Sequence, residues 1–257
     1  MSEQLVNSKT DLSKFSVEDI VNRMPPNYRA KLRERLTKAM KSGDKVRVYS
    51  DGVFDCFHSG HARLLEQIKK MLPNVEVVAG VCSDEDTIRE KGLVVMREQE
   101  RIDGAAMCKW ADEVYFPAPW YPTMEHLRSI NCDFIAHDTI PYAVEGIEDC
   151  YAGFKENGFF LPTLRSEGIS TSDIIKRIVA DRSEYISRNL KKGQTADDLN
   201  LDLYECVKYG AKPANTNVIN KAINWLLAFK LVAKLDVVRC LAVKTLCSKK
   251  KNKVKTI

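Results

Sequence analysis

In the middle of the chain, segments with the hydrophobic pattern of β-strands alternate with segments whose hydrophobic residues have helical spacing. The run 75–81 is apolar and rich in β-branched residues without alternation, which is typical of a strand covered on both faces. Shorter runs predict further strands at 46–49, 113–116, 133–136 and 159–161, and segments such as 62–71 and 83–90 have helical spacing between them. Strands and helices in alternation imply right-handed crossovers and a parallel sheet. The ligand crevice of such a sheet lies at the carboxyl ends of its strands.

The flanking regions predict two extensions of this α/β domain. A capping-box-like start at Ser16, a proline pair at 25–26 and a charged helix at 28–40 indicate a helical N-terminal extension over 1–44. The α/β domain itself is expected over 45–193. Glycine, proline and asparagine punctuate the next stretch and predict a linker over 194–220, followed by an apolar and basic segment over 221–257.

The apolar part of the last segment predicts a position at a membrane surface. It is long enough to span a bilayer, but five charged residues lie within it at 230–244, and each costs about 2.5 to 3.5 kcal/mol near the bilayer centre. Lysines beside an anionic leaflet contribute about 1 kcal/mol each. Binding at the interface is therefore favoured over a span. Two lysines share the apolar face of the helical wheel, which leaves lipid activation open.

Composition places the chain among globular proteins of a reducing compartment. Hydrophobic residues make up 44% and charged residues 29%, with a formal net charge of +5. The eight cysteines show no C-x-x-C spacing, so neither a zinc ribbon nor a disulfide scaffold is indicated. The first fifteen residues lack the apolar core of a secretory signal, so we expect a cytoplasmic or nuclear protein. No nucleic-acid-binding motif accompanies the basic tail, and no nucleic-acid partner is expected.

The stretch 47–61, RVYSDGVFDCFHSGH, predicts a strand, a loop and a helix that begins at its two histidines. The first turn of a helix has unpaired backbone N–H groups and the positive end of the helix dipole, which together favour an anion. Gly60 permits close approach of a phosphate, while His58 and His61 offer ring N–H donors. A metal pair is the rival interpretation, but a third ligand is missing nearby. Purely structural histidines are the other alternative.

A second helix start, RSEGISTSDIIKRI at 165–178, has a similar character. Gly168 precedes a hydroxyl-rich cluster that opens an apolar-periodic helix, and Arg165 offers a planar guanidinium. By itself the segment is equally well explained as a capped helix that binds nothing. Two such helix starts in one α/β domain favour a triphosphate ligand.

Both segments carry a family resemblance. DGVFDCFHSGHARLL resembles the His-x-Gly-His signature of the cytidylyltransferases, and RSEGIST is similar to the second signature of their choline-phosphate branch. Similarity continues between them through REKG around Lys91, Arg101, KWADE at 109–113, APW at 118–120 and HDTIPY at 137–142. The resemblance implies a Rossmann-like nucleotidyltransferase fold. It also implies transfer of the cytidylyl group from CTP to phosphocholine, Mg²⁺ as cofactor, and a homodimer in which KWADE lies at the interface.

The resemblance also assigns roles to individual residues. Catalysis is expected from four basic side chains, namely His58, His61, Lys91 and Arg165. CTP binding is expected from Val53, Phe54, His61, Lys91, His137, Asp138, Leu164, Arg165, Ser166, Glu167, Gly168, Ile169, Ser170 and Thr171. Leu164 stands where the family usually has glutamine, so a side-chain contact there is in doubt, and Ser166 replaces a usual threonine. No metal ligand is assigned to a protein side chain.

The acceptor is expected to bind in an aromatic box. A quaternary ammonium has no hydrogen-bond donor and is held by aromatic faces and a carboxylate. The resemblance implies that phosphocholine contacts Asp51, Lys91, Trp120, Tyr142 and Tyr151. Taken by itself, Trp120 between Pro119 and Tyr121 is better explained as a residue that fills a loop. The alternatives are an ethanolamine-phosphate enzyme, whose relatives lack this tryptophan, and a regulator without turnover, which would have lost Lys91 or one histidine.

Overall fold

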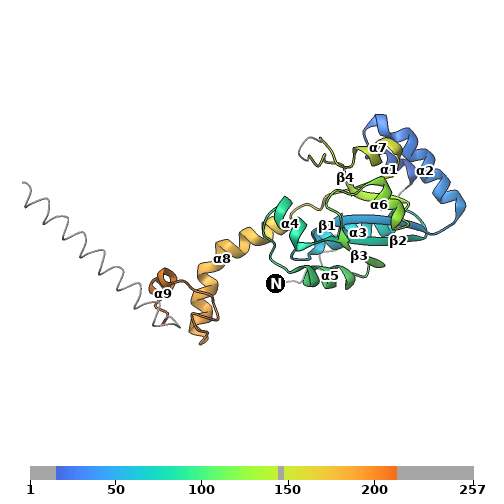
Figure 1. The fold of residues 1–257 in the computed structure, drawn as a ribbon. Coiled ribbons are helices and arrows are strands. Elements are labelled where there is room, and N and C mark those ends of the chain that lie inside the picture. Colours follow the sequence, from blue (N-terminus) through green and yellow to red (C-terminus); the bar gives the residue numbers. More distant parts are fainter. Residues whose placement is uncertain (1–15, 144–147, 213–257) are drawn as a thin grey trace, which may run out of the picture. The chain divides into compact units, whose positions relative to one another are not determined.

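The computed structural model describes residues 16–143 and 148–212, and the chain divides into two compact units, 1–176 and 177–257. Figure 1 shows the elements in chain order. The strands are β1 (Val46–Gly52), β2 (Val75–Cys82), β3 (Glu113–Ala118), β4 (Phe134–Asp138) and β5 (Phe160–Thr163). The helices are α1 (Val17–Asn22), the 3₁₀ turn η1 (Pro26–Tyr28), α2 (Arg29–Ser42), α3 (Ser59–Met71), α4 (Asp84–Glu90), α5 (Glu98–Ala106), α6 (Met124–Ser129), α7 (Ala152–Asn157), α8 (Thr171–Lys191) and α9 (Leu203–Tyr209).

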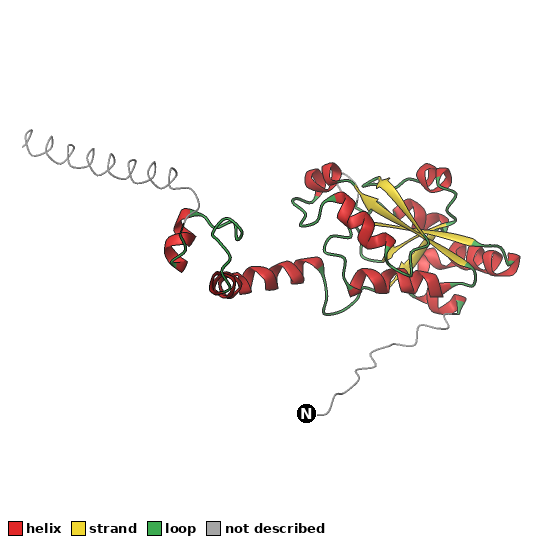
Figure 2. Cartoon of the chain, turned by 90° about the horizontal axis from the view of Figure 1, so that it is seen from below, coloured by secondary structure: helices red, strands yellow, loops and turns green. Residues whose placement is uncertain are grey.

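The five strands form one parallel sheet in the order β3-β2-β1-β4-β5. Helices lie on both of its faces (Figure 2). The predicted α/β class is thus confirmed, and β2 is buried along almost its whole length, as its unbroken apolar run indicated. Among the strands only the ends differ, since β3 continues to Ala118 and β5 begins at Phe160.

The strand order places a topological switch point beside β1. The chain moves from β1 to β2 on one side and later returns to β4 on the other side. A crevice opens where the carboxyl ends of two such strands diverge. Here that position lies between the ends of β1 and β4, at Gly52 and Asp138.

The two N-terminal helices belong to the same hydrophobic core as the sheet. Ile20 and Val21 of α1 and Leu32 and Leu36 of α2 are fully buried in that core. Helix α2 packs so closely on Gly158 that a Cβ there would lie 2.7 Å from the backbone carbon of Lys31. The predicted extension over 1–44 is therefore, from residue 16 onward, an integral layer of the α/β unit rather than an appendage.

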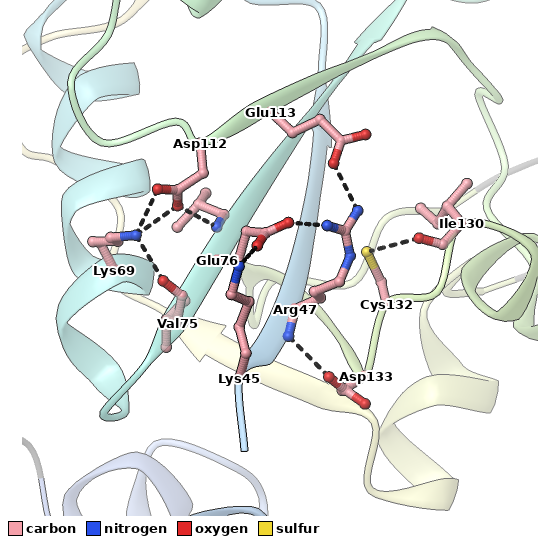
Figure 3. Close-up of polar contacts among 11 residues, drawn as sticks. Lys45, Arg47, Lys69, Val75, Glu76, Asp112, Glu113, Ile130, Cys132 and Asp133 are labelled. Carbon is pink, nitrogen blue, oxygen red and sulfur yellow. Dashed lines mark hydrogen bonds and ion pairs between the residues drawn. The ribbon is translucent and has the colours of Figure 1, made fainter. Parts of the chain in front are cut away.

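Charged side chains bind one another at the amino ends of the strands (Figure 3). Lys69 Nζ lies 2.6 Å from the Asp112 carboxylate, which also accepts the backbone N–H of Val77 at 2.7 Å. Arg47 forms ion pairs with Glu76 and, at 2.7 Å, with Glu113. The two acidic residues of the KWADE motif thus have partners within the chain.

In the second unit the described residues are 177–212. Tyr209 of α9 donates its hydroxyl to Ser183 Oγ of α8 at 2.8 Å, and Arg182 pairs with Glu205 at 3.0 Å. Helix α9 occupies part of the stretch 194–220 that was predicted as a linker, because Asp202 and Glu205 form a capping box that starts it. The first compact unit ends at residue 176, and the predicted end of the α/β domain at 193 stays a prediction. The segment 221–257 lies outside the described residues, and no helix among those described has the length and apolar content to cross a bilayer.

Candidate active site

A cavity of about 350 Å³ lies at the carboxyl ends of β1 and β4, where α3 and α8 begin. It brings together residues that are far apart in the sequence. The predicted site residues that line it are Asp51, Val53, Phe54, His58, His61, Lys91, His137, Asp138, Tyr142, Leu164, Arg165, Ser166, Ile169, Ser170 and Thr171. Four predicted residues that the structure also describes do not line it, namely Trp120, Tyr151, Glu167 and Gly168.

The two histidines form the start of α3 themselves. His58 Nδ1 accepts the backbone N–H of Gly60 at 3.0 Å, and His61 Nδ1 accepts the backbone N–H of His58 at 3.4 Å. Their rings stack with centroids 3.8 Å apart. Because each Nδ1 is an acceptor, the proton of each neutral ring is on Nε2. Both rings therefore carry their N–H donor at Nε2, which in His58 lies 3.4 Å from Thr171 Oγ1.

Burial keeps both rings neutral near pH 7. Desolvation, with smaller contributions from His58 and Lys91, lowers the pKa of His61 to about 4. Desolvation also lowers the pKa of His58. His61 is packed against the Phe54 and Phe57 rings at centroid distances of 5.3 and 5.5 Å. The histidines are thus fixed neutral donors, with no third His, Cys, Asp or Glu near enough to complete a metal site among the described residues.

Gly60 is required by the His58 ring. A Cβ at this position would lie 2.8 Å from His58 Cε1 and Nδ1 and 3.3 Å from Ile169 Cγ2. The reason for glycine is therefore packing of the imidazole onto the helix start, in addition to the phosphate access that the sequence suggested. Any other residue at position 60 would displace the catalytic-site ring.

The second helix start lies beside the first. Thr171 Oγ1 donates to the Asp55 carbonyl at 3.0 Å and lies 3.4 Å from His58 Nε2. Ser170 caps α8 by accepting the N–H of Asp173 at 3.1 Å. The hydroxyls at 170 and 171 are thus engaged within the chain, while both residues line the cavity and their contact with CTP stays a prediction. Their role here is to hold the helix end in place beside the histidines.

Gln67 connects the second loop to α3. Its side-chain amide donates to the Leu164 carbonyl and accepts the Leu164 N–H, each at 2.9 Å. Gln67 is buried, so this pair of hydrogen bonds is shielded from water. The backbone at Leu164 is therefore fixed by a residue that follows the histidines on the same helix.

Two buried charged residues organise the first loop. The Asp55 carboxylate accepts the backbone N–H groups of Val95 and Met96 at 3.0 and 2.9 Å, which ties the segment after Lys91 to the loop between β1 and α3. Arg101 is fully buried and donates to the Val53 carbonyl at 2.7 Å. Its other terminal nitrogen lies 2.7 Å from Asp84. Arg101 thus shapes the loop instead of forming a surface ion pair.

The opposite wall of the cavity is centred on Asp51. Tyr151 donates its hydroxyl to Asp51 Oδ2 at 3.0 Å, and its ring stacks on His137 with centroids 4.8 Å apart. Asp51 Oδ1 is buried without a hydrogen-bond partner among the described residues. Burial raises the pKa of Asp51, an effect that His137 and the Tyr151 hydroxyl oppose. A cation placed against Oδ1 would stabilise the ionised carboxylate.

Comparison with known proteins identifies this arrangement. Residues 49–177 match the family model described as cytidylyltransferase-like. The chain belongs to the cytidylyltransferase-like family. The matched range includes both helix starts and every residue that was predicted from the resemblance.

Several relatives of this cytidylyltransferase-like protein have names that state a substrate. Choline-phosphate cytidylyltransferase A of Homo sapiens is 48% identical over 195 residues, which cover 76% of this chain and 53% of that protein. The probable choline-phosphate cytidylyltransferase of Schizosaccharomyces pombe is 50% identical over 63% of this chain and 45% of its own length. The ethanolamine-phosphate cytidylyltransferase of Dictyostelium discoideum is 40% identical over 59% of this chain and 41% of its own length. The chain spans about half the length of these relatives.

Three positioning residues of this cytidylyltransferase-like site were missed or underrated from sequence. Gln67 lies three positions after Leu64 and one before Ile68, so it is a polar residue on the apolar face of α3, which was a usable signal. Asp55 and Arg101 gave no such signal, because a carboxylate in a turn and an arginine in a charged helix are usually solvated. Their importance depends on burial, which only the tertiary structure reveals.

Proposed function

We propose that this protein transfers the cytidylyl group of CTP to phosphocholine, giving CDP-choline and pyrophosphate. The observation that carries the proposal is the convergence of two helix N-termini, two Nε2–H donors and Lys91 on one cavity whose opposite wall has a buried carboxylate. Cations and donors suit the triphosphate, while the carboxylate suits a quaternary ammonium. The names of the relatives at 48–50% identity support this choice of acceptor.

The reaction is an in-line displacement at the α-phosphorus. A phosphate oxygen of phosphocholine forms the new P–O bond, and the bond from the α-phosphorus to the bridging oxygen breaks, so that pyrophosphate leaves. Negative charge grows on the phosphoryl oxygens and on the leaving group. His58 and His61 donate to those oxygens from Nε2, and Lys91 reduces the repulsion between the two substrates. Arg165, which lines the cavity, contributes a planar guanidinium to the outer phosphates.

Mg²⁺ is proposed as the cofactor that neutralises the remaining triphosphate charge. Mg²⁺ in such sites is held mainly by phosphate oxygens and water, with one or two carboxylates. Asp138 is a cavity-lining carboxylate that fits this role, and no group of three candidate ligands converges among the described residues. The donor set is thus compatible with an ion that arrives with the nucleotide.

A comparison of acceptors tests the proposal directly. The purified protein with CTP and Mg²⁺ is given phosphocholine, phosphoethanolamine or glycerol 3-phosphate in separate reactions, and pyrophosphate release and the CDP-linked product are measured. We expect phosphocholine to give the highest kcat/KM. Preference for phosphoethanolamine would replace the acceptor assignment, and absence of turnover with every acceptor would leave a nucleotide-binding regulator.

We further propose that the protein is a homodimer that binds anionic membranes through residues 221–257 and acts in the cytoplasm or nucleus, peripherally at the endoplasmic reticulum or nuclear membrane. The lysine-rich end of the sequence supports the membrane part. Flotation with vesicles of anionic or zwitterionic lipid, using the intact chain and a chain ending at Gly210, tests it. Equal recovery of both chains from anionic vesicles would contradict membrane binding through residues 221–257. Sedimentation equilibrium measures the oligomeric state and so tests the homodimer.

A further inference from the structure

Lys155 is a buried cation that the proposed reaction does not use. Its side chain is only 5% exposed, and its Nζ lies 2.6 Å from Asp149 Oδ2 and 3.4 Å from the Thr139 carbonyl. It also lies over the Phe160 ring at 4.8 Å. A lysine is seldom buried unless it is paired, so the burial of Lys155 indicates a specific structural role for its ion pair.

The partner carboxylate holds the two tyrosines of the predicted acceptor box. Asp149 Oδ1 accepts the backbone N–H of Tyr151 at 3.1 Å and that of Tyr142 at 3.4 Å. The Cys150 N–H in turn donates to the Tyr142 carbonyl at 3.1 Å. Asp149 is therefore a shared anchor for two backbone segments, one of which begins α7.

These contacts lead directly to the acceptor wall of the cavity. Tyr142 lines the cavity, and the Tyr151 hydroxyl donates to Asp51 at 3.0 Å. One oxygen of Asp149 sets the backbone of both tyrosines, while its other oxygen is fixed by Lys155. Lys155 does not line the cavity, so its effect on a ligand must pass through these residues.

We propose that the Lys155–Asp149 ion pair positions the acceptor wall and thereby sets the affinity for a phosphorylated quaternary amine, with a smaller effect on the affinity for CTP. The inference rests on the proposed function. Lys155 and Asp149 are positioning residues, because neither contacts the reacting atoms. The ion pair reaches the predicted CTP residues only through Thr139 and the Tyr151 ring on His137, and the second helix start and the loop before α3 have separate anchors at Gln67 and Asp55. The effect on CTP affinity should therefore be smaller.

The test uses four variants of the full chain. Lys155→Met removes the cation, Asp149→Leu removes both acceptors, and Asp149→Asn keeps an oxygen for the tyrosine N–H groups. Lys155→Met with Asp149→Asn removes both charges together and covers the case in which the single Lys155 variant does not fold. Lys69→Met is the matched control, because it breaks a Lys–Asp pair of 2.6 Å at the amino ends of the strands.

We expect Lys155→Met and Asp149→Leu to lower kcat/KM for phosphocholine by about ten- to a hundredfold, the cost of a small misplacement, with KM for CTP within about twofold of wild type. Asp149→Asn retains the acceptor and is expected to lose less. Lys69→Met should change neither KM. Hydrogen–deuterium exchange at the amides of Tyr142 and Tyr151 should accelerate in Lys155→Met, which reports on the anchor without any substrate.

Three results would overturn the inference. Unchanged exchange at these amides shows that the ion pair does not hold them, and equal rises in both KM values show general damage to the fold. An unchanged phosphocholine KM in folded variants shows that the wall does not depend on the pair. A wild-type enzyme that turns over no phosphocholine instead overturns the proposed function, so the two failures are distinguishable.

Discussion

At the scale of single residues, the site depends on rings that are fixed as neutral donors. His58 and His61 cap a helix with Nδ1 and keep Nε2–H for a ligand, so each imidazole has one structural and one functional nitrogen. This arrangement removes the need for a protonated histidine. The positive charge in the cavity comes instead from Lys91 and Arg165.

Replacing His61 by alanine should lower kcat by a factor on the order of 10² or more, as does loss of one oxyanion donor in other enzymes. The fold should persist, because the Phe54 and Phe57 rings still fill the surroundings. Steady-state pyrophosphate release measures the change, and thermal melting checks the fold. His126→Phe is the control, since it keeps the ring packing on Tyr49 and lies outside the cavity lining. A rate near wild type for His61→Ala would remove the assignment.

The His61 ring should titrate with a midpoint near pH 4 instead of the ordinary 6.5. The unfolded chain binds a proton at this residue near pH 6.5, but the folded chain does so only near 4. Stability from the buried neutral ring is therefore complete above pH 6.5 and is lost as the pH falls toward 4. Proton–nitrogen correlation spectra of the imidazoles, recorded from pH 7 to 4, measure the midpoint. A midpoint at 6.5 would show that the ring is solvated.

At the scale of elements, hydrogen bonds between loops and helices align the two phosphate-binding helix starts. Thr171 of α8 bonds to the loop before α3, and Gln67 of α3 bonds to the loop before α8. The two connections fix the distance between the ends of the helices. Positioning of the triphosphate then depends on both.

Gln67→Leu should raise KM for CTP about tenfold, since the Leu164 N–H and C=O would be left unpaired and the loop would shift. KM for phosphocholine should stay near its wild-type value. Gln67→Glu keeps the acceptor for the Leu164 N–H but loses the donor, so an intermediate effect is expected. Steady-state kinetics with each substrate varied in turn separate these outcomes. Parallel changes in both KM values would contradict the role given to Gln67.

The individual strands and helices could be predicted from the sequence, but the hydrogen bonds that hold them to one another could not. The unbroken apolar run of β2 and the periodic face of α3 follow from local pattern, so the parallel sheet and the helix starts could be anticipated, but no strand order was predicted. The hydrogen bond from the Val95 N–H to the Asp55 carboxylate joins residues 40 positions apart. Because the donor is a backbone group, the pattern of side chains in the sequence does not reveal this bond. Trp120 and Tyr151 were assigned to the acceptor only by the family resemblance, and they do not line the cavity, so their contact with a ligand stays a prediction.

At the scale of the whole α/β unit, binding and stabilising charges lie at opposite ends of the strands. The cavity occupies the carboxyl ends, and the pairs of Lys69, Arg47, Glu76, Asp112 and Glu113 occupy the amino ends (Figure 3). Substitutions among these pairs should therefore change the free energy of unfolding without changing the kinetics.

Asp112→Asn should destabilise the protein by about 0.2 to 1 kcal/mol at pH 7, because Lys69 loses its charged partner at the edge of the sheet and the pair is partly exposed. Burial works to raise the pKa of Asp112, but the Lys69 ammonium and the Val77 N–H outweigh it and the net pKa is lowered. The contribution of Asp112 is thus present above pH 3.8 and is lost as the pH falls through the lower folded value. Urea unfolding over a series of falling pH values measures it, and a difference that grows as the pH falls would contradict this sign.

The separation of the two ends of the sheet has a practical consequence for protein engineering. A more heat-resistant catalyst could be sought by redesigning the amino-end charges around Arg47 and Glu76 in a library selected for thermal tolerance alone. Because these side chains contact neither substrate wall, such a library need not be screened for retained turnover until its last round.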